Sequence, residues 1–385
     1  MAFFFTPVSA FSGIAVFVAL FFFIPLITMK KIKPSFRFSV FAAEIILIVM
    51  VLSYYTSDRR PEECNFDLHE NVVSILTYKQ CERQYKDTPQ EKLCLSVVDN
   101  PYDLALYRGQ LLVVSGRDYS TLGRLQPDKP GIFTAAPLGF GNLQEIVIDE
   151  KNSRAVFSMW KDRKILIYDL EKSAPVMYFP TRVSKLIGAE KYYDKVFVVS
   201  ELPWLYAVDL SGNTVKEHDL GYRFHTLNGM KIDVKRKAIY LTDWVWGKVY
   251  KINIPTMKTV RVASPGMVST GIALDTKKCE VYVARMLAAK IDVFNCDTLA
   301  LKRSIPAGFG VNEVALSGDG KKIYAMRYFA GKFRIIDRAT GNKLEEYHIG
   351  GQTRALLYSE SDNRIFTGTK CGIYEIKLKP FNKKR

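Results

Sequence analysis

A repeat of about 42 residues is the feature of this sequence that most restricts its fold. Each unit holds four short apolar runs separated by turn residues, and the clearest copy covers 227–263. Four short strands at a period near forty are typical of one β-propeller blade. The sequence therefore predicts an all-β, seven-bladed propeller, with six blades as the alternative because the unit around Lys191 matches poorly. Steps of 42 give seven equivalent positions, Tyr107, Asp149, Lys191, Asp233, Asp275, Ser317 and Ser359.

The last repeat unit ends after its third strand, at Leu378, so another segment must supply the fourth. We expect Lys92–Val98 to do so, because joining both ends of the domain removes two exposed sheet edges. A strand that pairs elsewhere is the alternative. The propeller then spans 92–380, followed by a basic tail at 381–385.

Two long apolar stretches precede the repeats. Residues 7–28 carry no charge, and residues 36–55 carry only Arg37 near their start and Glu44 inside. Each can cross a hydrocarbon core of about 30 Å as a helix. The loop between them is basic, so the positive-inside rule predicts that the loop is cytoplasmic and the propeller extracytoplasmic. We therefore expect a two-pass membrane hairpin at 1–57, with the basic residues Lys30, Lys31, Lys33 and Arg37 at its turn.

Glu44 is unusual inside a predicted span. An ionised carboxylate there costs at least a few kcal/mol unless it is paired or neutralised. Glu44 is either protonated near an interface or in contact with a polar group of another membrane protein.

Six cysteines are present, an even number on the predicted outer side of the membrane. An oxidising compartment allows them to pair, whereas reduced buried thiols are the alternative. Two cysteines lie in a polar connector at 58–91, in which residues 72–76 are read as a short helix or packing arm. The repeat register favours the pairs Cys279–Cys296 and Cys94–Cys371, and elimination leaves Cys64–Cys81.

The formal net charge is +16, from 55 basic and 39 acidic residues. Several basic groups, such as 235–237 and 277–278, fall in turns between the first and second strands of a unit, on one rim. Solvated turns explain them most simply, and anionic lipid headgroups or an acidic protein are the partners such a rim fits. Nucleic acid is not expected for an extracytoplasmic domain.

Residues that open the innermost strands, or follow the second strands, meet at the mouth of a propeller's central channel. Tryptophan and arginine gathered on one surface are typical of recognition sites, although packing between blades is an equal alternative. The candidate binding residues at this mouth are Asp103, Glu145, Trp160, Asn228, Asp243, Trp244, Arg285, Asn312, Glu313, Arg327 and Arg354.

The blade at 228–253, NGMKIDVKRKAIYLTDWVWGKVYKIN, resembles blades of gluconolactonase, regucalcin and strictosidine-synthase-like propellers. GIALDTKKCEVYV at 271–283 is similar to NHL and YVTN repeats. The first resemblance implies a lactonase or esterase with a bound divalent cation such as calcium, held here by Asn228 together with Glu145 or, alternatively, Asp103. Thr270 stands where those families have an aspartate.

No serine-hydrolase elbow, phosphate-binding loop or zinc-protease motif is present in the sequence. We therefore expect a membrane-anchored extracytoplasmic propeller that binds a membrane-protein partner as a scaffolding subunit. The calcium-dependent hydrolase is the alternative, and no cofactor is expected otherwise.

Overall fold

The computed structural model describes Cys64 and residues 66–115, 120–139, 143–183, 186–202, 204–211, 214–221 and 227–378. All of them belong to the second of two units into which the chain divides, Pro61–Arg385. The expected membrane hairpin, with Glu44, and the basic tail at 381–385 lie outside the described residues. Within the described ranges, no helix combines the length and apolar character that crossing a bilayer requires.

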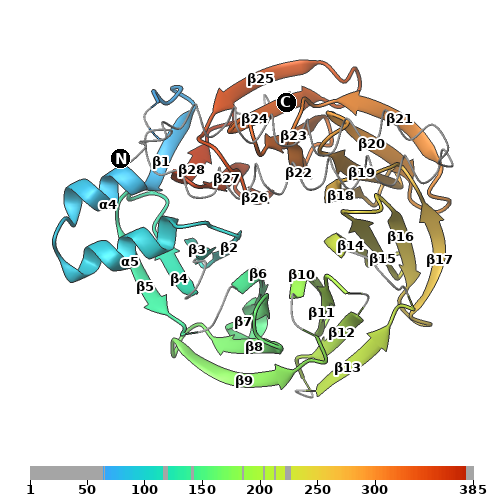
Figure 1. The fold of residues 1–385 in the computed structure, drawn as a ribbon, viewed down its shortest axis with the longest axis horizontal. Helices are drawn as coiled ribbons and strands as arrows, with labels where there is room; N and C mark the ends of the chain where they lie inside the picture. Colours follow the sequence, from blue (N-terminus) through green and yellow to red (C-terminus); the bar gives the residue numbers. More distant parts are fainter. Residues whose placement is uncertain are drawn as a thin grey trace, which may run out of the picture. The chain divides into compact units, whose positions relative to one another are not determined.

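Seven four-stranded antiparallel sheets surround one axis, so the predicted seven-bladed propeller is confirmed and the six-bladed alternative is wrong (Figure 1). The doubtful unit around Lys191 is a complete blade, although its first strand shifts register between Leu186 and Gly188. Blades 1 to 4, from the axis outward, are β2 (Asp103–Tyr107), β3 (Gln110–Ser115), β4 (Thr121–Leu125), β5 (Phe133–Pro137); β6 (Leu143–Asp149), β7 (Arg154–Met159), β8 (Lys164–Asp169), β9 (Ala174–Pro180); β10 (Leu186–Tyr192), β11 (Lys195–Ser200), β12 (Trp204–Asp209), β13 (Thr214–Asp219); and β14 (Leu227–Asp233), β15 (Ala238–Asp243), β16 (Val249–Asn253), β17 (Lys258–Ala263).

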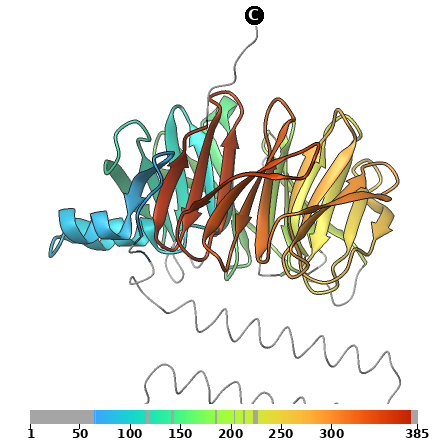
Figure 2. The ribbon, with the colours of Figure 1, turned by 90° about the horizontal axis from the view of Figure 1, so that it is seen from above.

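The remaining three blades follow the same order, except that the outer strand of blade 7 comes from the beginning of the described chain. A short 3-10 turn, Glu150–Asn152, joins β6 to β7. Figure 2 shows this propeller unit edge-on. Blades 5 to 7 are β18 (Ser269–Asp275), β19 (Glu280–Arg285), β20 (Lys290–Asn295), β21 (Leu301–Pro306); β22 (Val311–Leu316), β23 (Lys322–Arg327), β24 (Lys332–Asp337), β25 (Lys343–His348); and β26 (Ala355–Ser359), β27 (Arg364–Thr369), β28 (Gly372–Ile376), β1 (Val72–Thr77).

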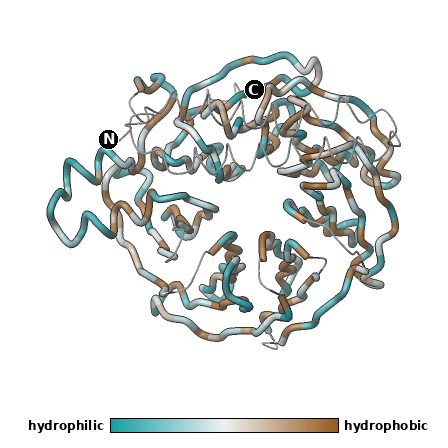
Figure 3. The backbone as a smooth tube through the Cα atoms, in the orientation of Figure 1, coloured by the Kyte–Doolittle hydropathy of each residue, from teal (hydrophilic) through white to brown (hydrophobic). Residues whose placement is uncertain are grey.

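The hydrophobic core lies between neighbouring blades. The middle strands are buried on both faces, as in β11 (KVFVVS), whereas outer strands such as β25 (KLEEYH) are mostly polar. Figure 3 shows the same gradient from hydrophobic inner strands to hydrophilic outer ones. Tyr240, Tyr282 and Tyr324 recur at the 42-residue period and are fully buried. Tyr240 donates a 2.8 Å hydrogen bond to the carbonyl of Cys296 in the next blade, so this position links adjacent blades.

Closure of the ring comes from β1, which pairs antiparallel with β28. An N-terminal closing strand was expected, but the predicted segment, Lys92–Val98, is wrong because it lies in helix α5 (Pro89–Val98). Proline at the first position of α5 favours a helix start, and Cys94, Val97 and Val98 are buried with helical spacing. Residues 72–76 were predicted from the sequence to form a short helix or packing arm. They instead belong to β1, and their β-branched and apolar side chains favour a strand.

Helix α4 (Tyr78–Gln84) follows β1 directly and begins at a capping box. The Thr77 hydroxyl accepts from the N–H of Gln80, and the Gln80 side chain accepts from the N–H of Thr77. Together α4 and α5 lie at the edge of blades 7 and 1 (Figure 1). Buried Cys81, Cys94 and Val97 belong to a core that includes Phe366 of blade 7 and Leu111 of blade 1.

All six cysteines are in disulfide bonds. The expected Cys279–Cys296 bond is present. The other two predicted pairings are wrong: the bonds are Cys64–Cys371 and Cys81–Cys94. The reason is the misplaced closing strand. Cys94 lies on α5 opposite Cys81 of α4, and the segment before β1 brings Cys64 to the loop between β27 and β28.

Candidate binding site

One face of the propeller, here called the mouth face, carries the loops that precede each innermost strand and the loops that join each second strand to its third. Across blades 4 to 7 these loops are joined by successive backbone hydrogen bonds of 2.7–3.1 Å. The N–H and carbonyl groups involved belong, in order, to Trp244, Val268, Met286, Gly310, Tyr328 and Gln352. The loops of neighbouring blades therefore form one continuous surface rather than independent tips.

Acidic side chains lie on the innermost strands of four blades, around the axis. An Asp103 carboxylate oxygen accepts from the N–H of Ile146, 2.9 Å away, and a Glu145 oxygen accepts from the N–H of Ala189, 2.6 Å away. Each bond joins one innermost strand to the next. Glu190 is paired with Lys231. Glu313 has no hydrogen-bond or ion-pair partner among the described residues. We call Asp103, Glu145, Glu190, Lys231 and Glu313 the axial cluster.

Three carboxyls of the axial cluster, those of Asp103, Glu145 and Glu313, have a raised pKa and hold their protons more tightly than ordinary ones. Burial raises the pKa of Asp103 to about 6 against the opposing backbone bonds, and it raises the pKa of Glu313 to about 8 although Lys231 is near. The pKa of Glu145 is raised well above its usual value by burial and by the neighbouring Asp103. Burial alone lowers the pKa of Lys231, but Glu190 outweighs it and the pKa is raised. Glu313 is therefore mostly neutral at pH 7.

Replacing Glu313 by glutamine is expected to raise stability at alkaline pH. A carboxyl whose folded pKa is raised contributes most below its unfolded value near 4.5, and this contribution is lost as the pH rises through about 8. At pH 8.5 Glu313→Gln should therefore exceed the wild type by about 2–4 kcal/mol in unfolding free energy, and equal it at pH 4.5. Urea unfolding between pH 4.5 and 9 measures the difference.

Glu171→Gln is the matched control, since Glu171 is an exposed carboxylate paired with Arg108 on the opposite face. The change in unfolding free energy caused by Glu171→Gln should be small and nearly constant over the same pH range. Parallel pH profiles for wild type and Glu313→Gln would show that Glu313 ionises freely at the axis.

Glu145, one of the residues predicted to hold calcium, does not fit such a site. Calcium takes several charged oxygens at 2.3–2.6 Å. Glu145 uses one oxygen on a backbone N–H and its pKa is raised, and the Thr270 hydroxyl faces the carbonyl of Ala284. Glu145 also belongs to no group of three His, Cys, Asp or Glu side chains with close ligand atoms in the described part of the chain. This arrangement gives no support to a calcium-dependent hydrolase mechanism.

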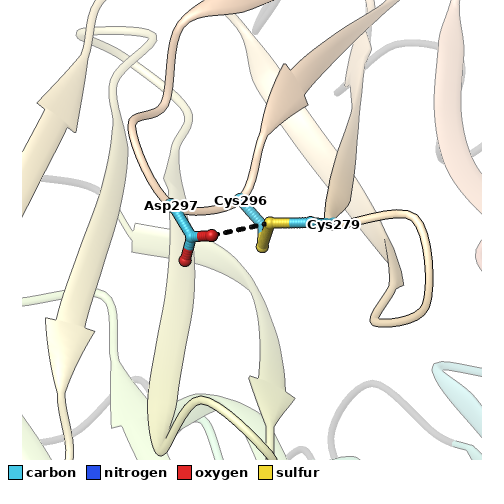
Figure 4. Close-up of side chains that lie close together, drawn as sticks. All are labelled: Cys279, Cys296 and Asp297. Carbon is cyan, nitrogen blue, oxygen red and sulfur yellow. Dashed lines mark hydrogen bonds between the residues drawn. A yellow bond between two sulfur atoms is a disulfide. The ribbon is translucent and has the colours of Figure 1, made fainter.

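The one such group among the described residues contains Cys279, Cys296 and Asp297 (Figure 4). An Asp297 oxygen lies 3.2 Å from the sulfur of Cys279. Both sulfurs are in the disulfide, so they carry neither a proton to donate nor a thiolate to bind a metal. The Cys279–Cys296 disulfide is therefore a structural cross-link within blade 5.

Large apolar side chains are exposed on the mouth face in blades 3 to 6. Trp246 is 55% exposed, Phe309 51% and Leu202 46%. The ring of Phe309 stacks on that of Phe329 in the adjacent loop, 5.6 Å between centroids. We call Leu202, Trp246, Phe309 and Phe329 the aromatic patch.

Gly247 fixes the position of the Trp246 loop. It has φ = +58°, and a Cβ atom there would lie 1.6 Å from the carbonyl oxygen of Gly266. Only glycine allows this approach of two loops. The exposed indole is thus held by a rigid backbone.

Arg354 lies on the mouth face at the junction of blades 6, 7 and 1, next to the Phe329 end of the aromatic patch. Its guanidinium is 5.2 Å from the ring of Tyr102 and 5.7 Å from that of Tyr328, and it donates to the Tyr328 hydroxyl. Among the described residues no carboxylate is within ion-pair distance of it. Nearby Gln352 is 5% exposed and neither amide atom has a partner in the same set. This region has a half-buried cation available for a partner, beside a buried amide without a hydrogen-bond partner among the described residues.

Other predicted mouth residues are engaged within the fold. Arg285 is buried and paired with Asp292 at 2.9 Å, and Arg327 is paired with Glu346. Asn312 donates to the carbonyl of Thr353. The remaining four are placed as follows: Asp243 is buried and accepts from the N–H of Trp246, Trp160 packs against the core between blades 3 and 4, Trp244 is half-buried, and Asn228 is half-buried near the start of β14.

Sequence reasoning missed part of this surface. Glu190 lies three residues beyond the position shared by Asp103, Glu145 and Glu313, whereas Lys231 lies two residues beyond it and therefore on the same face of a strand. That spacing was a usable signal. Phe309 stands between two glycines in a loop, and such an aromatic is a recognisable candidate for exposure.

No protein-family model matches this sequence, and no curated protein matches it. Among solved structures it is similar to the crystal structure of the Myceliophteria thermophila Cps50 (Swd1) β-propeller domain. The TM-score is 0.61 at 14% sequence identity, covering 73% of this chain and 97% of that one. The chain is thus a seven-bladed propeller structurally similar to a WD40 propeller. At this identity the likeness shows the fold and does not assign the chain to the NHL or YVTN families.

Proposed function

We propose that this chain is a membrane-anchored, extracytoplasmic propeller that binds a membrane-protein partner as a scaffolding subunit. The observation that carries the binding role is Arg354, held between two tyrosines without a carboxylate partner among the described residues. Arginine and tyrosine dominate the energetics of protein interfaces, and a guanidinium already oriented by stacking loses little entropy on binding. The fold itself is consistent with a protein-binding role.

Two further observations support the proposed location. All six cysteines are paired, as in proteins of oxidising compartments. The apolar stretches at 7–28 and 36–55 are each long enough to span a bilayer, and the basic loop between them favours an outside propeller. In this proposal Glu44 contacts the same partner within the bilayer.

Affinity purification of the full chain from native membranes in mild detergent, followed by mass spectrometry, tests the proposal. A specific membrane protein should be recovered with the wild type, and Arg354→Ala should reduce its affinity roughly tenfold or more. Arg108→Ala is the matched control, because Arg108 also stacks on a tyrosine but lies on the opposite face. Equal recovery with both variants would contradict a binding role for Arg354.

Glu44→Leu separates the bilayer contact from the mouth contact. Loss of the partner only in this variant would place recognition in the membrane hairpin rather than in the propeller. The calcium-dependent hydrolase receives no support from the axial geometry.

A further inference from the structure

The first described residue, Cys64, is bonded to Cys371 in the loop between β27 and β28. That loop joins a second strand to a third, so it lies on the mouth face. The chain therefore leaves the propeller from the rim of the mouth face, at blade 7.

Only eight residues, 56–63, separate Cys64 from the end of the second predicted span at residue 55. Fully extended, this tether reaches roughly 30 Å. Strands of five to seven residues make the disc about 20 Å thick before its loops are added. The mouth face thus has the short route to the bilayer, whereas the opposite face needs nearly the whole tether to pass around the edge of the disc.

The aromatic patch lies on the same face but around the ring from the tether, in blades 3 to 6. A lysine at or beside the start of the third strand recurs at the 42-residue period in blades 4 to 6, at Lys248, Lys290 and Lys332, next to the aromatic loops. Lys290 and Lys332 remain 35% and 41% exposed although each is paired with a carboxylate. Tryptophan and phenylalanine flanked by lysine are typical of groups that sit at a membrane–water interface.

The opposite face has a different character. Its turns between first and second strands mix basic residues, such as 235–237 and 277–278, with acidic ones, such as Asp194, Asp319 and Glu360. Arg236 there is already paired with Asp233 and Asp297. Tyr193 lies on it at 68% exposure with its ring against that of Tyr192, and Val234 is 38% exposed there. The mouth face therefore matches a lipid surface better than the opposite face.

We propose that the aromatic patch rests in the headgroup region of the bilayer, so that the disulfide tether at blade 7 and the patch at blades 3 to 6 hold the disc with its mouth face against the membrane. This inference rests on the proposed membrane anchor. It identifies the occupant of the patch as lipid and leaves the Arg354 region, beside the tether, to face the extracytoplasmic end of a neighbouring membrane protein.

The test uses the full chain in phosphatidylcholine–phosphatidylglycerol vesicles whose acyl chains carry bromine near the headgroup. Bromine quenches only indoles that reach the lipid. Tryptophan emission should be quenched, and Trp246→Phe should remove about half of that quenching or more. Adding Tyr193→Trp to the Trp246→Phe protein should restore none of it. Both variants alter exposed side chains and should keep the wild-type melting temperature.

Each alternative gives a distinct result. Restored quenching in the protein that carries Tyr193→Trp would place the opposite face on the bilayer and overturn the inference. Absence of lipid quenching, with Trp246 shielded from aqueous acrylamide, would mean that protein covers the patch and would also overturn it. Recovery of the protein after alkaline carbonate washing is scored separately, because release from vesicles contradicts the membrane anchor itself, whereas retention without quenching contradicts only the orientation.

Discussion

A protein that lacks both Cys64 and Cys371 is expected to lose more stability than any other disulfide variant of this chain. The bond closes a loop of 307 residues, and it ties the segment before the closing strand to the last blade. In the loop-entropy model, closing so long a loop contributes about 5 kcal/mol to the free energy of unfolding. Cys64→Ala/Cys371→Ala should therefore unfold at lower urea concentration and melt roughly 10 °C or more below the wild type.

Cys279→Ala/Cys296→Ala is the control, because that bond closes a loop of only 17 residues within blade 5. The same model gives it about 3 kcal/mol. The order of the two variants is the decisive result. If the long-range pair costs no more than the local pair, β1 alone holds the ring closed and the disulfide clasp is unimportant for folding.

The second large effect is expected at Arg338, the centre of a buried polar network between blades 5 and 6. Its guanidinium is 2% exposed, lies 2.6 Å from Asp275 and 2.9 Å from Glu280, and donates to the Tyr282 hydroxyl. Arg338→Met leaves the buried Glu280 and the half-buried Asp275 without this cation, so the variant should lose about 3–5 kcal/mol of unfolding free energy at pH 7.

The pH dependence of the stability of Arg338→Met tests whether Arg338 acts through its charge. Burial would raise the pKa of Glu280, but hydrogen bonds from Lys302, Tyr282 and Arg338 hold it at about 2. A lowered folded pKa contributes stability above the unfolded value near 4.5, and the contribution is lost as the pH falls toward 2. The deficit of Arg338→Met should therefore be largest above pH 5 and smaller at pH 3.

Arg182→Met is the matched control, since Arg182 forms an exposed ion pair with Glu217. It should cost less than about 1 kcal/mol at any pH. Adding Glu280→Gln to Arg338→Met should recover part of the loss, because the stranded carboxylate is removed. No recovery would mean that Arg338 acts by packing on Tyr282 rather than by charge.

The repeat made most of the fold predictable. Each blade buries the same pattern of residues against its neighbour, so equivalent positions such as Tyr240, Tyr282 and Tyr324 recur at a constant spacing. Blade 3 was harder to recognise from the sequence, yet its first strand keeps the period: the register shift between Leu186 and Gly188 recurs at the equivalent position in blades 2, 4, 5 and 6.

The closing strand lies outside the repeat, and the sequence therefore carried no periodic signal for it. KLCLSVV at 92–98 alternates enough to resemble a strand, yet its buried residues follow a helical spacing. Short apolar runs are ambiguous between helix and strand on periodicity alone. Two disulfide predictions depended on that assignment and were wrong with it, whereas Cys279–Cys296 depended only on the repeat.

The sequence predicted where the candidate site lies better than it predicted which side chains there are free to bind a partner. Residues that open the innermost strands, such as Asp103 and Glu313, do gather at the axis. Which arginine remains available could not be read from the sequence, because Arg285 is paired with Asp292 of the next strand, while Arg354 packs against two tyrosines and has no carboxylate partner among the described residues. Partner choice among side chains depends on distances that a one-dimensional pattern does not contain.

Thiol counting on protein taken from its native membrane tests the central claim most directly. The protein is denatured without reductant, treated with an alkylating reagent, and its intact mass is measured. The account of an extracytoplasmic propeller clasped through Cys64 and Cys371 predicts no alkylated cysteine before reduction and six after it. Six alkylated cysteines before reduction would contradict both the disulfide clasp and the location outside the cytoplasm.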